Sequence, residues 1–234
     1  RSLLSRKADT DFMRGFFVTG TGTGVGKTVA SAALAARTGY RYWKPIQTGP
    51  DDDTAEVRRL AGCEVFGQGV RLADPVSPHL AAQRAGIAID LQNFLGQPNN
   101  RARQEGLHCR PPVPALTGAA GGEGWIVEGA GGVLVPINDS ETMADLMRLL
   151  SLPIVVAARS TLGTINHTLL TLEALRSRSL QIAGVIMIGE RNPDNRAAIE
   201  SYGQVRILGE APWFDPLTPE CLRQWAAHSL ELPE

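Results

Sequence analysis

Short apolar segments recur along the chain, separated by polar or glycine-rich stretches. They are rich in Val and Ile and do not alternate with polar residues, which is typical of parallel strands covered on both faces. We expect strands at residues 15–19, 41–46, 125–127, 154–158, 182–188 and 205–208.

The segments between these strands carry apolar residues at helical spacing. Residues 27–38 are rich in Ala and end before Gly39, a common residue just after a helix. Further helices are expected at residues 164–178, 195–202 and 219–230, and in a segment opened by Asp139, Ser140 and Glu141. Strands that alternate with helices predict an α/β fold, a parallel sheet with helices on both faces.

The composition is typical of a soluble globular protein, with 43% hydrophobic and 20% charged residues. Because the formal net charge is −1, we expect no electrostatic binding to nucleic acid or to an anionic membrane. The apolar runs are too short to span a bilayer. The three cysteines form no C-x-x-C pair, which argues against a disulfide framework and favours a cytoplasmic location.

One glycine-rich stretch, FFVTGTGTGVGKT, joins the first predicted strand to the first predicted helix. The usual phosphate loop reads G-x-x-x-x-G-K-[ST], but here Thr21 takes the first position and Gly20 stands one residue further out. Backbone N–H groups of such a loop, and of the helix that follows, bind phosphate. We therefore expect a P-loop NTPase-like fold in which Lys27 reaches the β- and γ-phosphates of ATP and the Thr28 hydroxyl binds Mg²⁺.

The glycine-rich loop is the first of seven motifs that resemble, in order, those of the dethiobiotin synthetase family. They are VTGTGTGVGKT, WKPIQTG, DDDTAEV, PVSPHLAA, VEGAGGVLVPI, LGTINHTLLT and LGEAPW. The resemblance covers about residues 15–215 and fails at residues 1–14 and 92–124. Gly24 stands where the family often has an acidic or polar residue, so a side-chain contact from that point is lost.

The resemblance implies a ligase of biotin biosynthesis. Such an enzyme uses ATP and Mg²⁺ to join CO₂ to 7,8-diaminononanoate and to close the ureido ring of dethiobiotin. One amine becomes a carbamate, ATP converts it to a carbamic–phosphoric anhydride, and the second amine closes the ring. The family also implies a homodimer with shared sites.

Two lysines are expected to be catalytic, Lys27 and Lys44. Lys44 ends an apolar stretch and precedes Pro45, so it lies at a predicted strand end. We expect it to stabilise the carbamate and the oxygens of the transferring phosphoryl group.

Two carboxylates, Asp53 and Glu128, are expected to bind Mg²⁺ together with Thr28, since Mg²⁺ prefers oxygen ligands. Each is expected just after a strand, at the ligand-binding edge of the sheet. The run DDD leaves Asp51 and Asp52 as alternatives to Asp53.

The substrate is expected to meet hydroxyl groups at one end and a helix N-terminus at the other. Thr48 and Ser77 offer the hydroxyls. A helix N-terminus binds carboxylate, and in the family the corresponding loop comes from the neighbouring subunit. The distal carboxylate is therefore assigned to Gly163, Thr164, Ile165 and Asn166. His79 and His167 are expected to have structural roles.

The base of the nucleotide is expected to be read weakly. The family often has an Asn-Asp pair after the strand matching 182–188, but here Ile188 and Gly189 stand there, whose side chains form no hydrogen bonds. The residues expected to contact ATP are Gly24, Val25, Gly26, Lys27, Thr28, Val29, Asp53, Glu128, Gly129, Ala130, Gly131, Ile188, Gly189, Pro212, Trp213 and Phe214.

We expect residues 1–14 to be an N-terminal extension and residues 15–234 to form a single P-loop domain, with a loop-rich stretch at 92–124. Two other functions share this general fold. Partitioning ATPases carry an additional lysine early in the loop, and residues 21–25 contain none. Amidating cobyrinate synthases need a glutaminase domain, for which 234 residues leave no room.

Overall fold

The computed structural model describes residues 14–67, 69–95 and 124–232. Its main feature is a seven-stranded parallel sheet of order β4-β2-β6-β1-β7-β8-β9. The strands are β1 (Gly15–Gly20), β2 (Arg41–Trp43), β4 (Val65–Phe66), β6 (Trp125–Gly132), β7 (Ile154–Arg159), β8 (Ile182–Ile188) and β9 (Ile207–Ala211).

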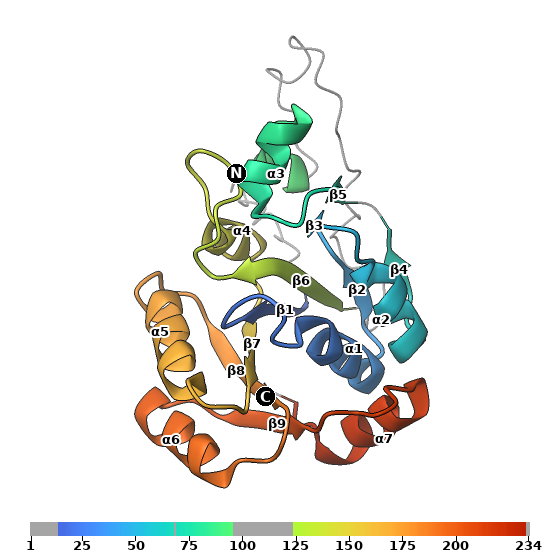
Figure 1. Cartoon of the computed structure of the whole chain (residues 1–234), viewed down its shortest axis with the longest axis vertical. Helices are drawn as coiled ribbons and strands as arrows, with labels where there is room; N and C mark the ends of the chain where they lie inside the picture. Colours follow the sequence, from blue (N-terminus) through green and yellow to red (C-terminus); the bar gives the residue numbers. More distant parts are fainter. Residues whose placement is uncertain (1–13, 68, 96–123, 233–234) are drawn as a thin grey trace, which may run out of the picture.

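Helices cover both faces of this sheet (Figure 1). On one face lie α1 (Lys27–Thr38), α2 (Asp53–Ala61) and α7 (Pro219–Ser229), and on the other α4 (Met143–Leu150), α5 (Thr164–Arg176) and α6 (Pro193–Gly203). Each face has its own buried apolar cluster, because every central strand is apolar on both sides. The predicted doubly wound α/β architecture is confirmed.

Long apolar or alanine-rich segments were predicted well. The predicted strand at 182–188 and the predicted helix at 27–38 have the bounds of β8 and α1. The other predicted helices differ from α5, α6 and α7 by at most two residues at an end. The helix predicted in the segment opened by Asp139 is α4, which begins at Met143 because Thr142 and Asp145 form a capping box there.

The single strand predicted at 41–46 is wrong. The chain leaves the main sheet after β2, and β3 (Ile46–Thr48) pairs instead with β5 (Val70–Leu72) in a separate two-stranded sheet. Pro45 lies at the break, and proline has no N–H to donate to a ladder. Lys44 therefore stands between two sheets rather than inside one.

Two helices were not predicted from the sequence, α2 and α3 (Pro78–Ala85). Asp52 caps α2 by accepting a hydrogen bond from the N–H of Ala55 at 3.0 Å. Ser77 and Pro78 take the N-cap and N1 positions of α3. Both helices place residues of the DDDTAEV and PVSPHLAA motifs at their N-termini.

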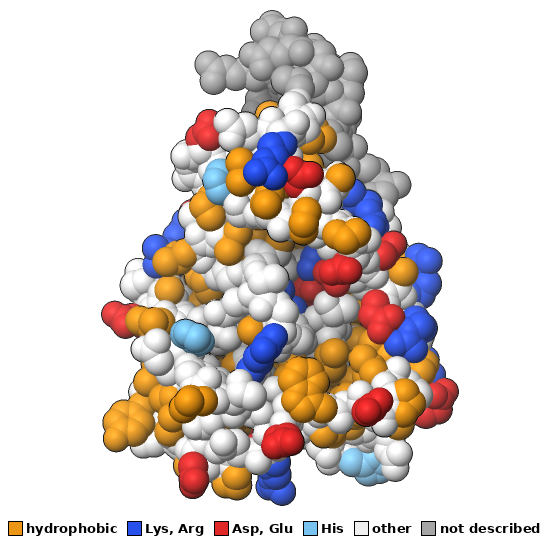
Figure 2. Space-filling view, in the orientation of Figure 1, with side chains coloured by type: hydrophobic (Ala, Val, Ile, Leu, Met, Phe, Trp, Pro, Cys, Tyr) orange, Lys and Arg blue, Asp and Glu red, His pale blue; other side chains and the backbone are white. Residues whose placement is uncertain are grey.

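The predicted extension at 1–14 lies outside the described residues except for Arg14, and so does most of the predicted loop at 92–124. The described start of that loop belongs to a 3-10 helix, Leu91–Leu95. Among the described helices, none is both long and apolar enough to cross a membrane. Figure 2 shows positive and negative side chains interspersed over the face seen in Figure 1.

Candidate active site

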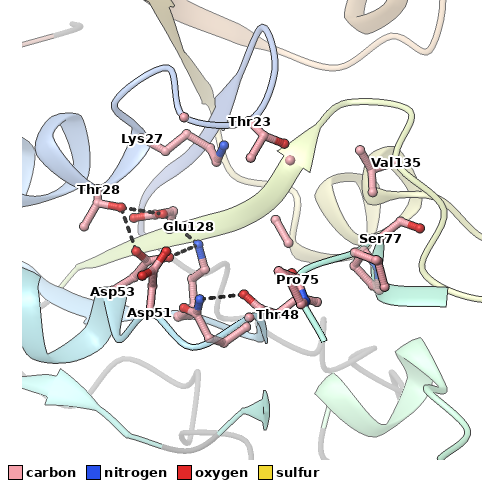
Figure 3. Close-up of a pocket in the computed structure, with 18 of the residues that line it drawn as sticks. Thr23, Lys27, Thr28, Thr48, Asp51, Asp53, Pro75, Ser77, Glu128 and Val135 are labelled. Atoms are coloured by element: carbon pink, nitrogen blue, oxygen red, sulfur yellow. Dashed lines mark hydrogen bonds and ion pairs between the residues drawn. The ribbon is translucent and has the colours of Figure 1, made fainter. Parts of the chain in front are cut away.

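A cavity of about 600 Å³ opens beside the carboxyl ends of β1, β2 and β6. It lies where open α/β sheets place their ligands. Its lining comes from the glycine-rich loop, the β2–α2 connection, the N-terminus of α3 and the end of β6. In Figure 3 Lys27, Thr28, Asp53 and Glu128 lie at one end of the cavity and Ser77 and Val135 at the other.

The glycine-rich loop connects β1 to α1 as predicted. Gly24 and Gly26 have φ values of 67° and 96°, in the left-handed region that favours glycine. Gly26 is also the N-cap of α1, and a side chain there would collide with Ile188. The loop therefore directs its backbone toward the cavity at the start of a helix, where phosphate binds.

Lys27 is directed back onto its own loop, where its Nζ donates to the carbonyl oxygen of Gly22 at 3.0 Å. Burial lowers the pKa of Lys27, an effect that Glu128 and Asp53 oppose and Lys44 reinforces. The net pKa lies below the ordinary lysine value. A bound anion would stabilise this ammonium group, so Lys27 is suited to contact phosphate.

Lys44 joins the two carboxylates expected to bind metal. Its Nζ lies 2.7 Å from Asp53 Oδ2 and 2.7 Å from Glu128 Oε1, and it also donates to the carbonyl oxygen of Gly129 at 3.2 Å. Burial alone would lower the pKa of Lys44, but Glu128 and Asp53 outweigh it and the pKa is raised. The lysine is therefore charged, and it neutralises the acidic pair from the inside.

Thr28 completes this cluster from the first turn of α1. Its hydroxyl lies 3.0 Å from Asp53 Oδ1 and 3.3 Å from Glu128 Oε1. Of the three consecutive aspartates, Asp53 is the one that contacts Thr28 and Lys44. Asp52 instead caps α2 and lies 3.3 Å from Arg71, while Asp51 lines the cavity.

The oxygens of Thr28, Asp53 and Glu128 fit a magnesium ion. They are hard donors from three separate elements, and they face one cavity that also contains the glycine-rich loop. No group of three or more His, Cys, Asp and Glu side chains suited to a metal occurs within residues 14–67, 69–95 and 124–232. A two-carboxylate set suits Mg²⁺, which takes its remaining ligands from phosphate and water.

The prediction that Glu128 comes just after its strand is wrong. The residue lies within β6 and pairs with Val18 of β1. The strand continues to Gly132, and a side chain at Gly129 would collide with Phe17. The carboxylate is fully buried, at 0% exposure. Asp53 likewise does not follow a strand directly, since it is the first residue of α2.

Comparison with known proteins points to one family. A family model described as an AAA domain matches residues 14–221. An ATP-dependent dethiobiotin synthetase from Paramagnetospirillum magneticum is 49% identical over 85% of this chain and 87% of its own length. Those from Sphingopyxis alaskensis and Brucella ovis are 43% and 41% identical, over 90% and 93% of this chain and 93% and 94% of theirs. The chain belongs to the dethiobiotin synthetase family.

Solved structures support the fold of this synthetase-family chain but say nothing of its chemistry. A ParA family ATPase from Chlorobium tepidum superposes with a TM-score of 0.51 at 12% identity, covering 92% of this chain and 98% of the other. The signal recognition particle receptor FtsY from Elizabethkingia anophelis gives 0.50 at 11% identity, covering 94% and 66%.

Not every residue that the synthetase motifs single out reaches the cavity. Its lining includes eight of the residues expected to contact ATP, together with Lys44, Thr48 and Ser77 expected for catalysis and substrate. The eight are Gly24, Gly26, Lys27, Thr28, Asp53, Glu128, Ala130 and Gly131. Gly163, Thr164, Ile165 and Asn166 lie elsewhere, at the start of α5.

The predicted base end lies apart from the cavity. Ile188 is only 2% exposed and packs against Gly26, and the N–H of Gly189 donates to Ala211. The carbonyl oxygen of Ile188 accepts from the N–H of Ser160. Trp213 is 59% exposed. The Ile188 side chain thus supports the loop and offers no open surface to a base.

Two features of the site in this synthetase-family chain were missed in the sequence, one in the cavity lining and one behind it. Gln47 is buried against the cavity, and its Oε1 has no hydrogen-bond partner among the described residues. Tyr42 donates from its hydroxyl to Glu128 Oε2 at 3.0 Å. Tyr42 stood in an apolar stretch and so suggested only core packing, whereas Gln47 stood inside a recognised motif, WKPIQTG.

Proposed function

We propose that this chain is an ATP-dependent dethiobiotin synthase. It joins CO₂ to 7,8-diaminononanoate and closes the ureido ring at the expense of ATP. The observation that carries the proposal is the cluster of Lys27, Lys44, Thr28, Asp53 and Glu128 around one cavity. The identities of 41–49% with dethiobiotin synthetases support the same conclusion.

The reaction has three steps. An amine of the substrate attacks CO₂ and loses a proton, giving a carbamate. A carbamate oxygen attacks the γ-phosphorus of ATP, releasing ADP and forming a carbamic–phosphoric anhydride. The second amine then attacks the carbamoyl carbon, phosphate leaves, and a second proton is lost as the ring closes.

The charged end of the cavity is suited to the phosphoryl transfer. The glycine-rich loop and Lys27 hold the triphosphate, and Thr28, Asp53 and Glu128 hold Mg²⁺. When bound, Mg²⁺ neutralises developing charge on phosphate oxygens. Lys44 lines the cavity and contacts both carboxylates, so its ammonium group is suited to stabilise the carbamate and the transferring oxygens.

The other end of the cavity is suited to the diamine. Thr48 and Ser77 line it and offer hydroxyl groups. Ser77 is the N-cap of α3, but its hydroxyl does not cap the helix and instead lies 3.0 Å from His79 Nδ1. That hydroxyl is therefore placed by His79, which agrees with a structural role for this histidine.

The active unit is a homodimer in the cytoplasm. Within one chain the start of α5 lies apart from the cavity, so a distal carboxylate would be bound by these residues only across a subunit boundary. A second hollow of about 470 Å³ lies between the loop residues Thr21–Thr23 and α5. Leu134 and Leu170 line it and are exposed, at 50% and 56%, and an apolar surface of this kind fits a second copy.

Product analysis tests the proposed function. Purified protein with ATP, Mg²⁺, bicarbonate and 7,8-diaminononanoate should release ADP in step with dethiobiotin detected by mass spectrometry. Leaving out bicarbonate or the diamine should reduce ADP release to a slow background. Release of ADP without the ring product would overturn the proposal.

Mixed dimers test the shared site. Lys27→Ala and Asn166→Ala should each be weakly active alone, and mixing the two after dissociation should restore part of the activity, because one site of each mixed dimer is intact. A fully active monomer in sedimentation experiments would contradict this arrangement.

A further inference from the structure

Tyr42 is a completely buried tyrosine at the centre of β2, with 0% exposure. Its hydroxyl is 3.0 Å from Glu128 Oε2. A buried tyrosine hydroxyl needs a partner, and a carboxylate gives a strong, charge-assisted bond. The bond joins residues 86 positions apart in the sequence, on neighbouring strands of the main sheet.

The sheet register explains why these two side chains meet. Tyr42 pairs with Ile126, two residues before Glu128 on β6. Because side chains two apart on a strand share a face, Tyr42 and Glu128 are diagonal neighbours on one face of the sheet. Trp43, the next residue, points to the other face and packs against Phe66 and Phe94.

The two oxygens of Glu128 have different partners. Oε1 is contacted by Lys44 at 2.7 Å and by Thr28 at 3.3 Å, both of which line the cavity. Oε2 is contacted by Tyr42, which does not line the cavity. The tyrosine therefore holds one oxygen back and turns the other toward the residues expected around the metal.

The Tyr42 hydroxyl lies in the completely buried interior of the sheet, outside the cavity lining, and donates to Glu128 Oε2. Lys44, by contrast, lines the cavity and contacts Asp53, Glu128 and the carbonyl oxygen of Gly129. Tyr42 is therefore a partner of Glu128 that holds the carboxylate from behind the cavity.

We propose that Tyr42 is a positioning residue for the metal site, which fixes the carboxylate of Glu128 so that Oε1 alone is presented to the cavity. Groups that hold metal ligands from behind orient those ligands, and their loss typically weakens metal binding by about 10–100-fold. The inference rests on the proposed function only for the identity of the metal and the nucleotide.

Metal binding without turnover tests this role. The free Mn²⁺ signal in electron paramagnetic resonance, measured with ADP and no diamine, should give an Mn²⁺ affinity about tenfold weaker for Tyr42→Phe than for the natural chain. Tyr40→Phe is the matched control, because it removes the same hydroxyl from a neighbouring, half-buried residue, and its Mn²⁺ affinity should be unchanged. The affinity for ADP in EDTA should be the same in all three proteins.

A merely structural tyrosine would give a different pattern. Tyr42→Phe would then lower the melting temperature while leaving Mn²⁺ affinity within twofold, and that result would overturn the proposal. A double-mutant cycle adds a second criterion. Glu128→Gln should weaken Mn²⁺ binding strongly, and adding Tyr42→Phe to it should have little further effect; full additivity would also contradict the proposal.

A spectroscopic measurement keeps the proposal testable even if Tyr42→Phe does not fold. The chain has three tyrosines, so 3-fluorotyrosine labelling gives signals that Tyr40→Phe and Tyr202→Phe assign by difference. The Tyr42 fluorine signal should shift when Mg²⁺ is added to the ADP complex, and Glu128→Gln should remove that shift. A Tyr42 signal insensitive to Mg²⁺ would overturn the proposal. None of these outcomes depends on dethiobiotin synthesis.

Discussion

At the phosphate end of the predicted nucleotide site, charged groups are buried and bonded to one another, whereas at the base end Ile188 is buried and Trp213 lies exposed. Lys44 and Glu128 are 7% and 0% exposed and share a 2.7 Å contact. Trp213 is 59% exposed, and the backbone N–H of Gly189 is already bonded within the sheet. Both ends lie at the same edge of one sheet.

This contrast indicates where affinity and selectivity arise. Electrostatic contacts in a buried site are strong and depend on geometry, while apolar contact discriminates weakly between flat ring systems. The chain is therefore expected to recognise a triphosphate with its metal far more strictly than it recognises the base. Five experiments would sharpen this contrast or contradict it.

The largest effect is expected from Lys27→Ala. Removing the ammonium group from the loop should reduce turnover by an amount corresponding to about 3–6 kcal/mol in the barrier. Coupled ADP release measures the loss, and circular dichroism checks the fold. Arg148→Ala removes an exposed cation on α4 and should leave turnover unchanged. Turnover within tenfold of the natural chain would remove Lys27 from the mechanism.

Lys44→Ala should lose turnover in a similar range and should also destabilise the metal-free protein. It leaves two carboxylates without their buried counter-ion, and breaking such a pair costs about 3–5 kcal/mol. Mg²⁺ should restore part of the melting temperature, since it replaces the missing positive charge. Near-normal turnover would contradict the catalytic role.

Replacing the aspartates one at a time should separate the metal ligand from the helix cap. Asp53→Asn should raise the Mg²⁺ concentration needed for half-maximal turnover by more than about tenfold. Asp52→Ala, which removes the cap of α2, should affect the melting temperature more than the Mg²⁺ requirement. An unchanged Mg²⁺ titration in Asp53→Asn would transfer the ligand role to Asp51 or Asp52.

Replacing ATP by CTP or GTP should have a smaller effect than the substitutions at the phosphate end. We expect kcat/KM for CTP and GTP to be lower than for ATP by a factor that corresponds to no more than about 1–3 kcal/mol, the range that apolar contact supplies. Steady-state assays at saturating Mg²⁺ measure the ratio. A preference for ATP beyond roughly a thousandfold would show that the base is read by hydrogen bonds.

The smallest effect is expected on the free energy of unfolding at acid pH, measured in EDTA so that no metal is bound. Burial raises the pKa of Asp53, but Lys44 and Thr28 outweigh it, so the folded pKa lies below the ordinary value of about 3.9. The stabilisation is then present above pH 3.9 and is lost as the pH falls through the folded pKa. Urea unfolding should show that the natural chain loses more stability on acidification than Asp53→Asn. Parallel curves would mean that Asp53 contributes nothing.

The cavity lining contains more of the residues expected at the phosphate end than at the base end, for a physical reason. Lys27 and Thr28 follow each other at a strand–helix junction, so local pattern alone locates them. The pairing of Lys44 with Glu128 spans 84 positions and depends on which strands are neighbours. The family resemblance gave each residue a separate role and predicted neither this pairing nor the Tyr42 bond, since both depend on how β2 lies beside β6.

The missed helices have a similar explanation. In α2 only Val57 and Leu60 are buried, so an amphipathic pattern is hardly visible in its nine residues. The break of the predicted strand at Pro45 required knowing that a second small sheet would receive β3. These features depend on tertiary contacts, whereas β8 and α1 are specified by their own composition.

Ile188 belongs to the predicted base end of the site and also packs against the phosphate loop, so a substitution there would affect both ends. Its side chain fills the space that glycine leaves at position 26, so it works as a mechanical support for the loop that receives phosphate. An amide side chain at position 188, of the kind common in the family, could form hydrogen bonds with the base. It would also place a polar group beneath that loop. In this chain the position serves the loop, because the Ile188 side chain occupies the space beside Gly26. A descendant of this chain that acquires strict base recognition would therefore be expected to change a different residue, or to rebuild the loop together with Ile188.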